Sequence, residues 1–100
     1  MALKLYFRPS FKRSLKNLGK QQKIVVASIM ESLNVYYANN CDLQKAKELS
    51  AGFFYKQLRK PYYEAGIEKN IRVVIRKEGW MCIAVLAGNH DQIKRFLSES

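Results

Sequence analysis

The spacing of apolar residues divides the N-terminal half of the chain into one strand and two helices. Residues 3–8 alternate apolar and polar side chains, which predicts a half-buried strand that ends at Pro9. Ser10 has the chemistry of a helix cap, and apolar residues at spacings of four and three predict a short helix that stops at Gly19. Residues 20–39 carry a broad apolar stripe, which predicts a longer helix. We expect the two helices to form a hairpin.

The next segment combines a polar connector with a strand whose two faces are hard to assign. Residues 41–50 predict a connector with one helical turn, and residues 53–59 a strand. We place Phe54 and Leu58 under the helices, so that Lys56 must extend its ammonium group from the core side. The open face of this strand then presents Tyr55, Gln57 and Arg59.

A predicted loop and then a predicted hairpin of two strands follow in the sequence. Residues 60–69 contain Pro61 and Gly66, and they predict an extended loop rather than a strand. Residues 71–76 alternate cleanly and predict a strand with arginines on its open face. After a turn, residues 80–87 form an almost wholly apolar run typical of a central strand.

The chain ends in a predicted short helix. Asn89, followed three positions later by Gln92, has the form of a capping pair. The apolar edge of this helix consists of Ile93, Phe96 and Leu97. The whole pattern predicts a single α+β domain over residues 1–100, with a helical hairpin on a small, mainly antiparallel sheet of about four strands.

The charge of the chain indicates a polyanionic partner. The formal net charge is +10 on 100 residues, and no acidic residue occurs before Glu31. The positive electrostatic field of such a chain attracts nucleic acid. A solvated basic helix face or a binding surface for an acidic protein would give the same distribution of charged residues. Charge alone leaves these alternatives open.

Composition narrows the chemistry further. Cys41 and Cys82 are far apart and form no disulfide or zinc motif, which favours a cytoplasmic protein. The polar and apolar alternation of the first residues excludes a signal peptide or membrane span there. The eight acidic residues are scattered, so we expect no metal site and no cofactor.

His90 is the single histidine, and the capping pattern places it at the first position of the terminal helix. A helix N-terminus attracts phosphate and disfavours a positively charged imidazole. His90 could therefore exchange a proton near neutral pH, as cleavage of a phosphodiester requires. An ordinary exposed histidine at a helix start would have the same sequence context.

Cations and aromatic residues accompany this histidine. Arg72 and Arg76 share one face of a predicted strand, and we expect Arg59 on the neighbouring strand. Guanidinium groups bind phosphate with planar, paired donors, and tyrosine rings can stack on bases. A solvated strand with buried tyrosines is the structural alternative.

The order of these elements resembles the RelE/ParE superfamily of type II toxin–antitoxin toxins. The resemblance covers nearly the whole chain, and it is carried by YKQLR at 55–59, IRVVIR at 71–76 and AGNHDQIKRFL at 87–97. For a RelE-like member it implies metal-independent cleavage of messenger RNA on the ribosome and an acidic antitoxin partner. A ParE-like inhibitor of DNA gyrase and a non-catalytic basic RNA-binding module are the alternatives.

The resemblance also implies roles for individual residues. Arg72 matches the strand arginine that contacts the scissile phosphate, and His90 matches a catalytic position in the final turn. Phe96 stands where RelE has a functional tyrosine, so the general base is unassigned among Lys56, Tyr62, Tyr63 and Glu64. The expected RNA-binding residues are Tyr55, Lys56, Gln57, Arg59, Lys60, Tyr63 and Arg76.

Overall fold

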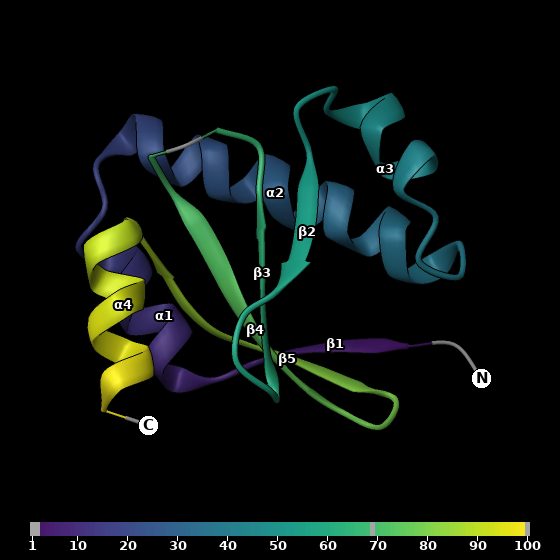
Figure 1. The fold of residues 1–100 in the computed structure, drawn as a ribbon. Coiled ribbons are helices and arrows are strands. Elements are labelled where there is room, and N and C mark those ends of the chain that lie inside the picture. The colour runs from purple at the N-terminus through teal and green to yellow at the C-terminus, as the bar shows by residue number, and fades with distance from the viewer. Residues whose placement is uncertain (1–2, 69, 100) are drawn as a thin grey trace.

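A five-stranded mixed sheet forms the centre of the structure (Figure 1). The computed structural model describes residues 3–68 and 70–99, so Lys69 of the predicted loop lies outside the described residues. The strand order is β1-β5-β4-β3-β2, in which β2 to β5 run antiparallel and β1 pairs parallel to β5. The elements are β1 (Lys4–Phe7), α1 (Pro9–Lys16), α2 (Lys20–Ala38), α3 (Leu43–Leu49), β2 (Phe54–Gln57), β3 (Tyr62–Gly66), β4 (Arg72–Glu78), β5 (Met81–Gly88) and α4 (His90–Ser98).

The predicted α+β class is confirmed, but the sheet has one strand more than expected. Residues 62–66, predicted as part of a loop, form β3 between β2 and β4. Pro61 precedes this strand and leaves its hydrogen bonding intact. Gly66 ends it, and a Cβ atom there would lie 2.7 Å from the ring of Phe54. The two residues that indicated a loop therefore mark the ends of a strand.

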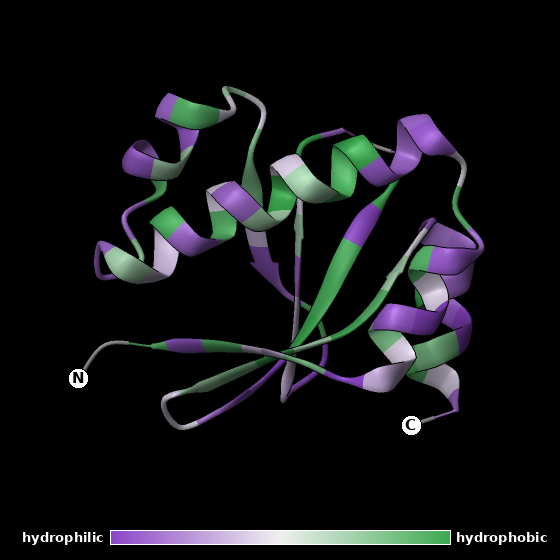
Figure 2. Cartoon of the chain, turned by 180° about the vertical axis from the view of Figure 1, so that it is seen from behind, coloured by the Kyte–Doolittle hydropathy of each residue, from purple (hydrophilic) through white to green (hydrophobic). Residues whose placement is uncertain are grey.

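Both faces of the sheet are covered, which gives the protein two cores. On one face, Phe11 of α1 and Ile29 and Leu33 of α2 pack with Val73 and Ile75 of β4. Figure 1 shows α4 on the opposite side of the sheet from α2. The second core consists of Tyr62, Val74, Val85 and Ile93, with Leu58, Ile83, Leu86, Phe96 and Leu97 around it. The central strands are accordingly hydrophobic over much of their length (Figure 2).

The start of α1 differs from the prediction in its capping. Arg8, rather than Ser10, is the N-cap, and Pro9 occupies the first turn, where a missing N–H is tolerated. The Ser10 hydroxyl instead donates to the Val85 carbonyl at 2.7 Å, and Ser14 Oγ accepts from the Ala87 N–H at 3.0 Å. These bonds satisfy the edge of β5 where its pairing with β1 has ended.

The end of α1 also differs. Asn17 is the C-cap of this helix, and Gly19, which was expected to stop it, is the N-cap of α2. The connection between the two helices is therefore short. Both helices contribute to the same core, as expected for the predicted pair.

The cap of α4 is confirmed. Asn89 Oδ1 accepts from the Gln92 N–H at 2.9 Å, while Gln92 Oε1 accepts from the Asn89 N–H at 2.8 Å. Asp91 adds a negative charge in the first turn, where the helix dipole favours it. This reciprocal pair fixes where the helix begins, and therefore where His90 lies.

Replacing Asn89 by Ala removes the oxygen that accepts the Gln92 N–H. We expect the free energy of unfolding to fall by about 1 kcal/mol, whereas Asn89→Ser, which keeps a capping oxygen, should retain most of the stability. Urea unfolding followed by circular dichroism measures both effects. Equal stability of the Ala and Ser variants would show that this cap contributes nothing.

Candidate functional site

A buried carboxylate on β3 gathers the cations of the candidate site. Glu64 is 2% exposed and lies in the middle of β3. It accepts a hydrogen bond from Arg72 Nη1 at 2.9 Å, and the Lys56 ammonium lies 3.3 Å from the same carboxylate oxygen. Lys56 reaches it directly because the two residues are paired across β2 and β3. A buried carboxylate needs such partners to remain charged.

Arg72 is held from two sides. Its side chain is 18% exposed, and the guanidinium carbon lies 5.4 Å from the ring centroid of Phe54. Within the described part of the chain, its Nε is buried without a hydrogen-bond partner. Glu64 and Phe54 thus hold the guanidinium in one orientation where it lines the pocket.

His90 completes a small pocket at the start of α4. The pocket has a volume of about 140 Å³. Its lining residues are Lys56, Leu58, Glu64, Arg72, His90, Ile93, Lys94 and Leu97. It therefore brings together an imidazole at a helix N-terminus, a fixed guanidinium, a buried carboxylate and two lysines. Such a set can bind a phosphate group and can both accept and donate a proton.

Two of these groups were not assigned from the sequence. In the sequence, Glu64 is only one of four possible bases, and it lies in the predicted loop. Lys94 was not considered, although it lies four residues after His90 and so shares its helix face. That spacing was the signal in the sequence that could have identified Lys94.

The structure does not bring the other predicted cations into this pocket. Arg59 donates from Nη2 to the Leu97 carbonyl at 2.6 Å, near the end of α4. It also does not lie on a strand adjacent to Arg72, since β3 separates β2 from β4. Lys60 is exposed in the loop after Arg59. These two residues remain candidates for contacts outside the pocket.

Arg76 lies at a separate place on the same face. It is four residues from Arg72, a distance of about 13 Å along a strand. Its Nε is 2.5 Å from the Glu78 carboxylate, and this bond raises the pKa of Arg76. Arg72 and Arg76 therefore do not form the predicted single cluster.

The assignment of the faces of β2 was wrong. Phe53 and Tyr55 belong to the core under α2, and the Tyr55 hydroxyl lies 2.8 Å from that of Tyr37. Burial raises the pKa of both hydroxyls well above the usual range. The prediction failed because it assumed one covered face, whereas Leu58 packs in the second core beneath α4. Lys56 therefore reaches the pocket from an exposed position.

Because the two faces of β2 are exchanged relative to the prediction, two further expected RNA-binding residues lie away from the pocket. Gln57 and Tyr63 are paired across β2 and β3 and lie on the Tyr55 side of the sheet. The Tyr63 ring stacks on that of Tyr55, with centroids 5.4 Å apart and planes at 14°. The three residues Tyr55, Gln57 and Tyr63 therefore do not share a surface with Arg72 and His90.

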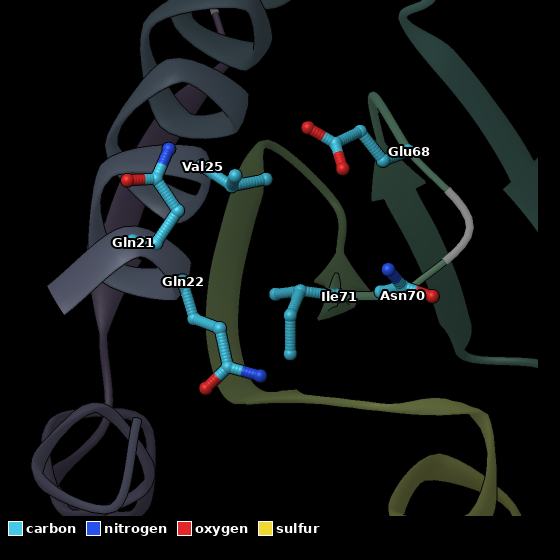
Figure 3. Close-up of a pocket in the computed structure, with 6 residues that line it drawn as sticks. All are labelled: Gln21, Gln22, Val25, Glu68, Asn70 and Ile71. Atoms are coloured by element: carbon cyan, nitrogen blue, oxygen red, sulfur yellow. The ribbon is translucent and has the colours of Figure 1, made fainter. Parts of the chain in front are cut away.

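A larger hollow lies between α2 and the connection from β3 to β4 (Figure 3). Its volume is about 230 Å³, and its lining residues are Gln21, Gln22, Val25, Glu68, Asn70 and Ile71. This lining contains no histidine, lysine or arginine among the described residues. The pocket at His90 is smaller but carries the reactive groups.

Two further findings concern cofactors and membranes. Within residues 3–68 and 70–99, no group of three histidine, cysteine, aspartate or glutamate side chains is placed to hold a metal ion. None of the described helices combines the length and apolar character needed to cross a bilayer.

Glu64 and Lys56 offer a direct test of which contacts the fold needs. Glu64→Gln leaves the mostly buried Arg72 without a counter-charge, so we expect a loss of about 2–4 kcal/mol in the free energy of unfolding. Lys56 is 59% exposed, so Lys56→Gln should cost less than about 1 kcal/mol. Urea unfolding of both variants checks this order. If Glu64→Gln left the free energy of unfolding unchanged, the carboxylate would not anchor the site.

Neither the family models nor the curated protein sequences contain a match to this chain. Solved structures do match. A chain of the E. coli DinJ–YafQ toxin–antitoxin complex is 14% identical with a TM-score of 0.67, covering 93% of this chain and 98% of its own. A chain of the RelB–RelE antitoxin–toxin complex of Methanococcus jannaschii is 18% identical with a TM-score of 0.60. This match covers 91% of the present chain and 96% of the other.

A third match is a mutant toxin from Helicobacter pylori, 19% identical with a TM-score of 0.58, covering 91% of this chain and 98% of that one. All three likenesses span nearly the full length of both chains, so they concern the whole architecture rather than one motif. At these identities they establish the fold: this chain adopts the α+β fold of RelE-type toxins, as the sequence resemblance implied.

Proposed function

We propose that the protein is the toxin of a toxin–antitoxin pair and that it cleaves messenger RNA without a metal ion. The observation that carries this proposal is the pocket in which Arg72, His90 and Glu64 meet. The fold likeness to toxins supports the same reading. The number of cations fits the substrate, since Lys56, Arg72 and Lys94 line this pocket with a single carboxylate.

RNA contains its own nucleophile, which makes metal-independent cleavage possible. A base removes the proton from the 2′-hydroxyl, and the 2′-oxygen attacks the adjacent phosphorus. The bond from phosphorus to the 5′-oxygen then breaks, and an acid gives a proton to that leaving oxygen. The products are a 2′,3′-cyclic phosphate and a 5′-hydroxyl. The protein must supply proton transfer and stabilise the charge on the phosphate.

Three residues of the pocket are suited to these tasks. Arg72 holds the phosphate through the guanidinium donors that Glu64 and Phe54 keep in place. His90, at the positive end of α4, donates a proton to the leaving oxygen. Glu64 accepts the proton of the 2′-hydroxyl, since it is the carboxylate within the pocket.

The positions of the four candidate residues support one choice of base. Tyr62 is buried beneath Phe96, with ring centroids 5.2 Å apart, and Tyr63 lies on the other face of the sheet. Lys56 and Glu64 are the two of the four candidates that line the pocket. We assign the base to Glu64, because a carboxylate offers acceptor oxygens whereas a lysine ammonium group offers only donors.

We further propose that an acidic antitoxin neutralises the protein in the cytoplasm and that the ribosome presents the messenger RNA. A formal charge of +10 favours a segment of opposite charge that folds as it binds. Such a complex should be tight and sensitive to salt.

The most direct test is expression in bacteria, with mapping of messenger RNA ends. Wild-type protein should produce new ends, and His90→Ala should reduce them by about 100-fold or more while largely keeping affinity for RNA. Asp91→Asn is the matched control, because Asp91 is exposed on the same helical turn and does not line the pocket. It should cleave as wild type does.

A supercoiling assay on DNA gyrase, run in parallel, separates the alternatives. Intact messages together with inhibited gyrase would contradict the proposal and favour a ParE-like inhibitor. Unchanged cleavage by His90→Ala would remove this residue from the mechanism. Binding of RNA without new ends would indicate the non-catalytic module.

A further inference from the structure

A strip of exposed aromatic and basic residues lies on the α4 side of the sheet, beyond the candidate pocket. Tyr6 of β1 is 40% exposed and Trp80, in the turn from β4 to β5, is 43% exposed. Their ring centroids are 6.2 Å apart with planes tilted by 59°. Large aromatic side chains left exposed side by side indicate a binding surface.

Backbone register places this strip on the same face as the pocket. Tyr6 is paired with Ile83, and Arg76 is paired with Ile83 from the other side. Ile83 packs in the core beneath α4, whereas Leu5 of β1 and Leu3 just before it pack against the opposite core. Figure 1 shows the turn from β4 to β5 beside the N-terminal part of β1, away from α4. α4 therefore leaves this part of the sheet face uncovered.

Cations accompany the two rings. The Lys4 ammonium lies 6.0 Å from the Trp80 ring centroid. Arg8 and Arg76 line a hollow of about 150 Å³ between α4 and the start of α1, together with Ser10, Tyr62, Val85 and Phe96. Arg76 uses its Nε to bond Glu78, and a guanidinium has further N–H groups to donate. Two arginines in one hollow fit the oxygens of a phosphate.

From these features we infer that Tyr6, Trp80, Arg8 and Arg76 form a second contact surface for single-stranded RNA. The arginine hollow holds a backbone phosphate, and bases stack on the two rings. Aromatic side chains alternating with cations are the arrangement that binds single strands without sequence preference. The strip carries Lys4, Arg8 and Arg76, and only Arg76 of these three has an ion pair with a carboxylate among the described residues, so the strip also has the charge for RNA.

The strip and the pocket are close enough to hold one strand. Tyr6 lies level with Arg76 and two interstrand spacings, or about 10 Å, across the sheet from it. Arg72 of the pocket lies about 13 Å further along β4 from Arg76. This inference rests on the proposed RNA substrate, but it concerns affinity and positioning rather than bond cleavage. It therefore predicts effects on binding that do not depend on His90.

The test measures binding of a short 2′-O-methyl oligonucleotide, which cannot be cleaved through its 2′-oxygen, by fluorescence anisotropy. Tyr6→Ala and Trp80→Ala should each weaken binding by about tenfold. Phe7→Ala is the matched control. Phe7 is 49% exposed and lies on β1 like Tyr6, but its ring contacts that of Phe11 near the other core. This variant should bind as wild type does, and thermal unfolding confirms that each variant is folded.

The arginines are tested by the salt dependence of the same binding. Arg8→Gln should lower the slope of log affinity against log salt by about 0.7, the value for one phosphate contact on a single strand. Lys47→Gln, on the exposed side of α3, should leave the slope unchanged. Unchanged binding by the Tyr6, Trp80 and Arg8 variants would overturn the inference. Loss of antitoxin binding alone would assign the strip to a protein partner and would also overturn it.

The test of this binding surface and the test of the nuclease can fail independently. Wild-type protein that binds the oligonucleotide through the strip but never cleaves messages would support this surface and reject the nuclease. Intact cleavage in cells, together with oligonucleotide binding that does not change in the Tyr6 and Trp80 variants, would support the nuclease and reject this surface.

Discussion

The contact between Glu64 and its two cations determines both the sheet and the site. A carboxylate that is 2% exposed in the middle of β3 can persist only with partners at hydrogen-bond distance, and Arg72 and Lys56 provide them from the strands on either side. The same contact that makes the strand possible aims the guanidinium into the pocket. Stability and the candidate chemistry therefore depend on one group.

Coverage of the sheet on both faces is the second constraint. α1 and α2 pack on one face and α4 on the other, so the strands must be apolar on both sides where these helices cover them. Polar residues occur where the pocket opens and where α4 leaves the sheet uncovered near Tyr6 and Trp80. α4 packs through Ile93, and its capping pair fixes its first residue as His90. The short terminal helix thus closes the second core and also brings an imidazole into the pocket that Arg72 lines.

Local signals in the sequence were sufficient for most elements. The terminal helix, its cap at Asn89 and the hairpin of β4 and β5 depend on neighbouring residues, and they were predicted correctly. β3 was missed because a buried glutamate between Pro61 and Gly66 looks like a loop until its partners on β2 and β4 are known. The faces of β2 were exchanged because the pattern of that strand cannot show that a helix far along the chain covers its other side.

The site was partly predictable for the same reason. Arg72 and His90 could be selected from a strand face and a helix start, and the structure brings them into one pocket. Tyr55, Gln57 and Tyr63 were separated from them by the exchanged faces, and Arg76 by its distance along β4. The role of Glu64 depends on contacts between three strands, which no local pattern contains.

The chemical nature of the RNA ends tests the central claim most directly. If Arg72, His90 and Glu64 promote attack by the 2′-hydroxyl, messages cut by the purified protein on ribosomes will carry a 5′-hydroxyl on one fragment and a 2′,3′-cyclic phosphate, or the phosphate formed when it opens, on the other. Fragments with a 5′-phosphate and a 3′-hydroxyl would contradict this account, because such ends require an external nucleophile.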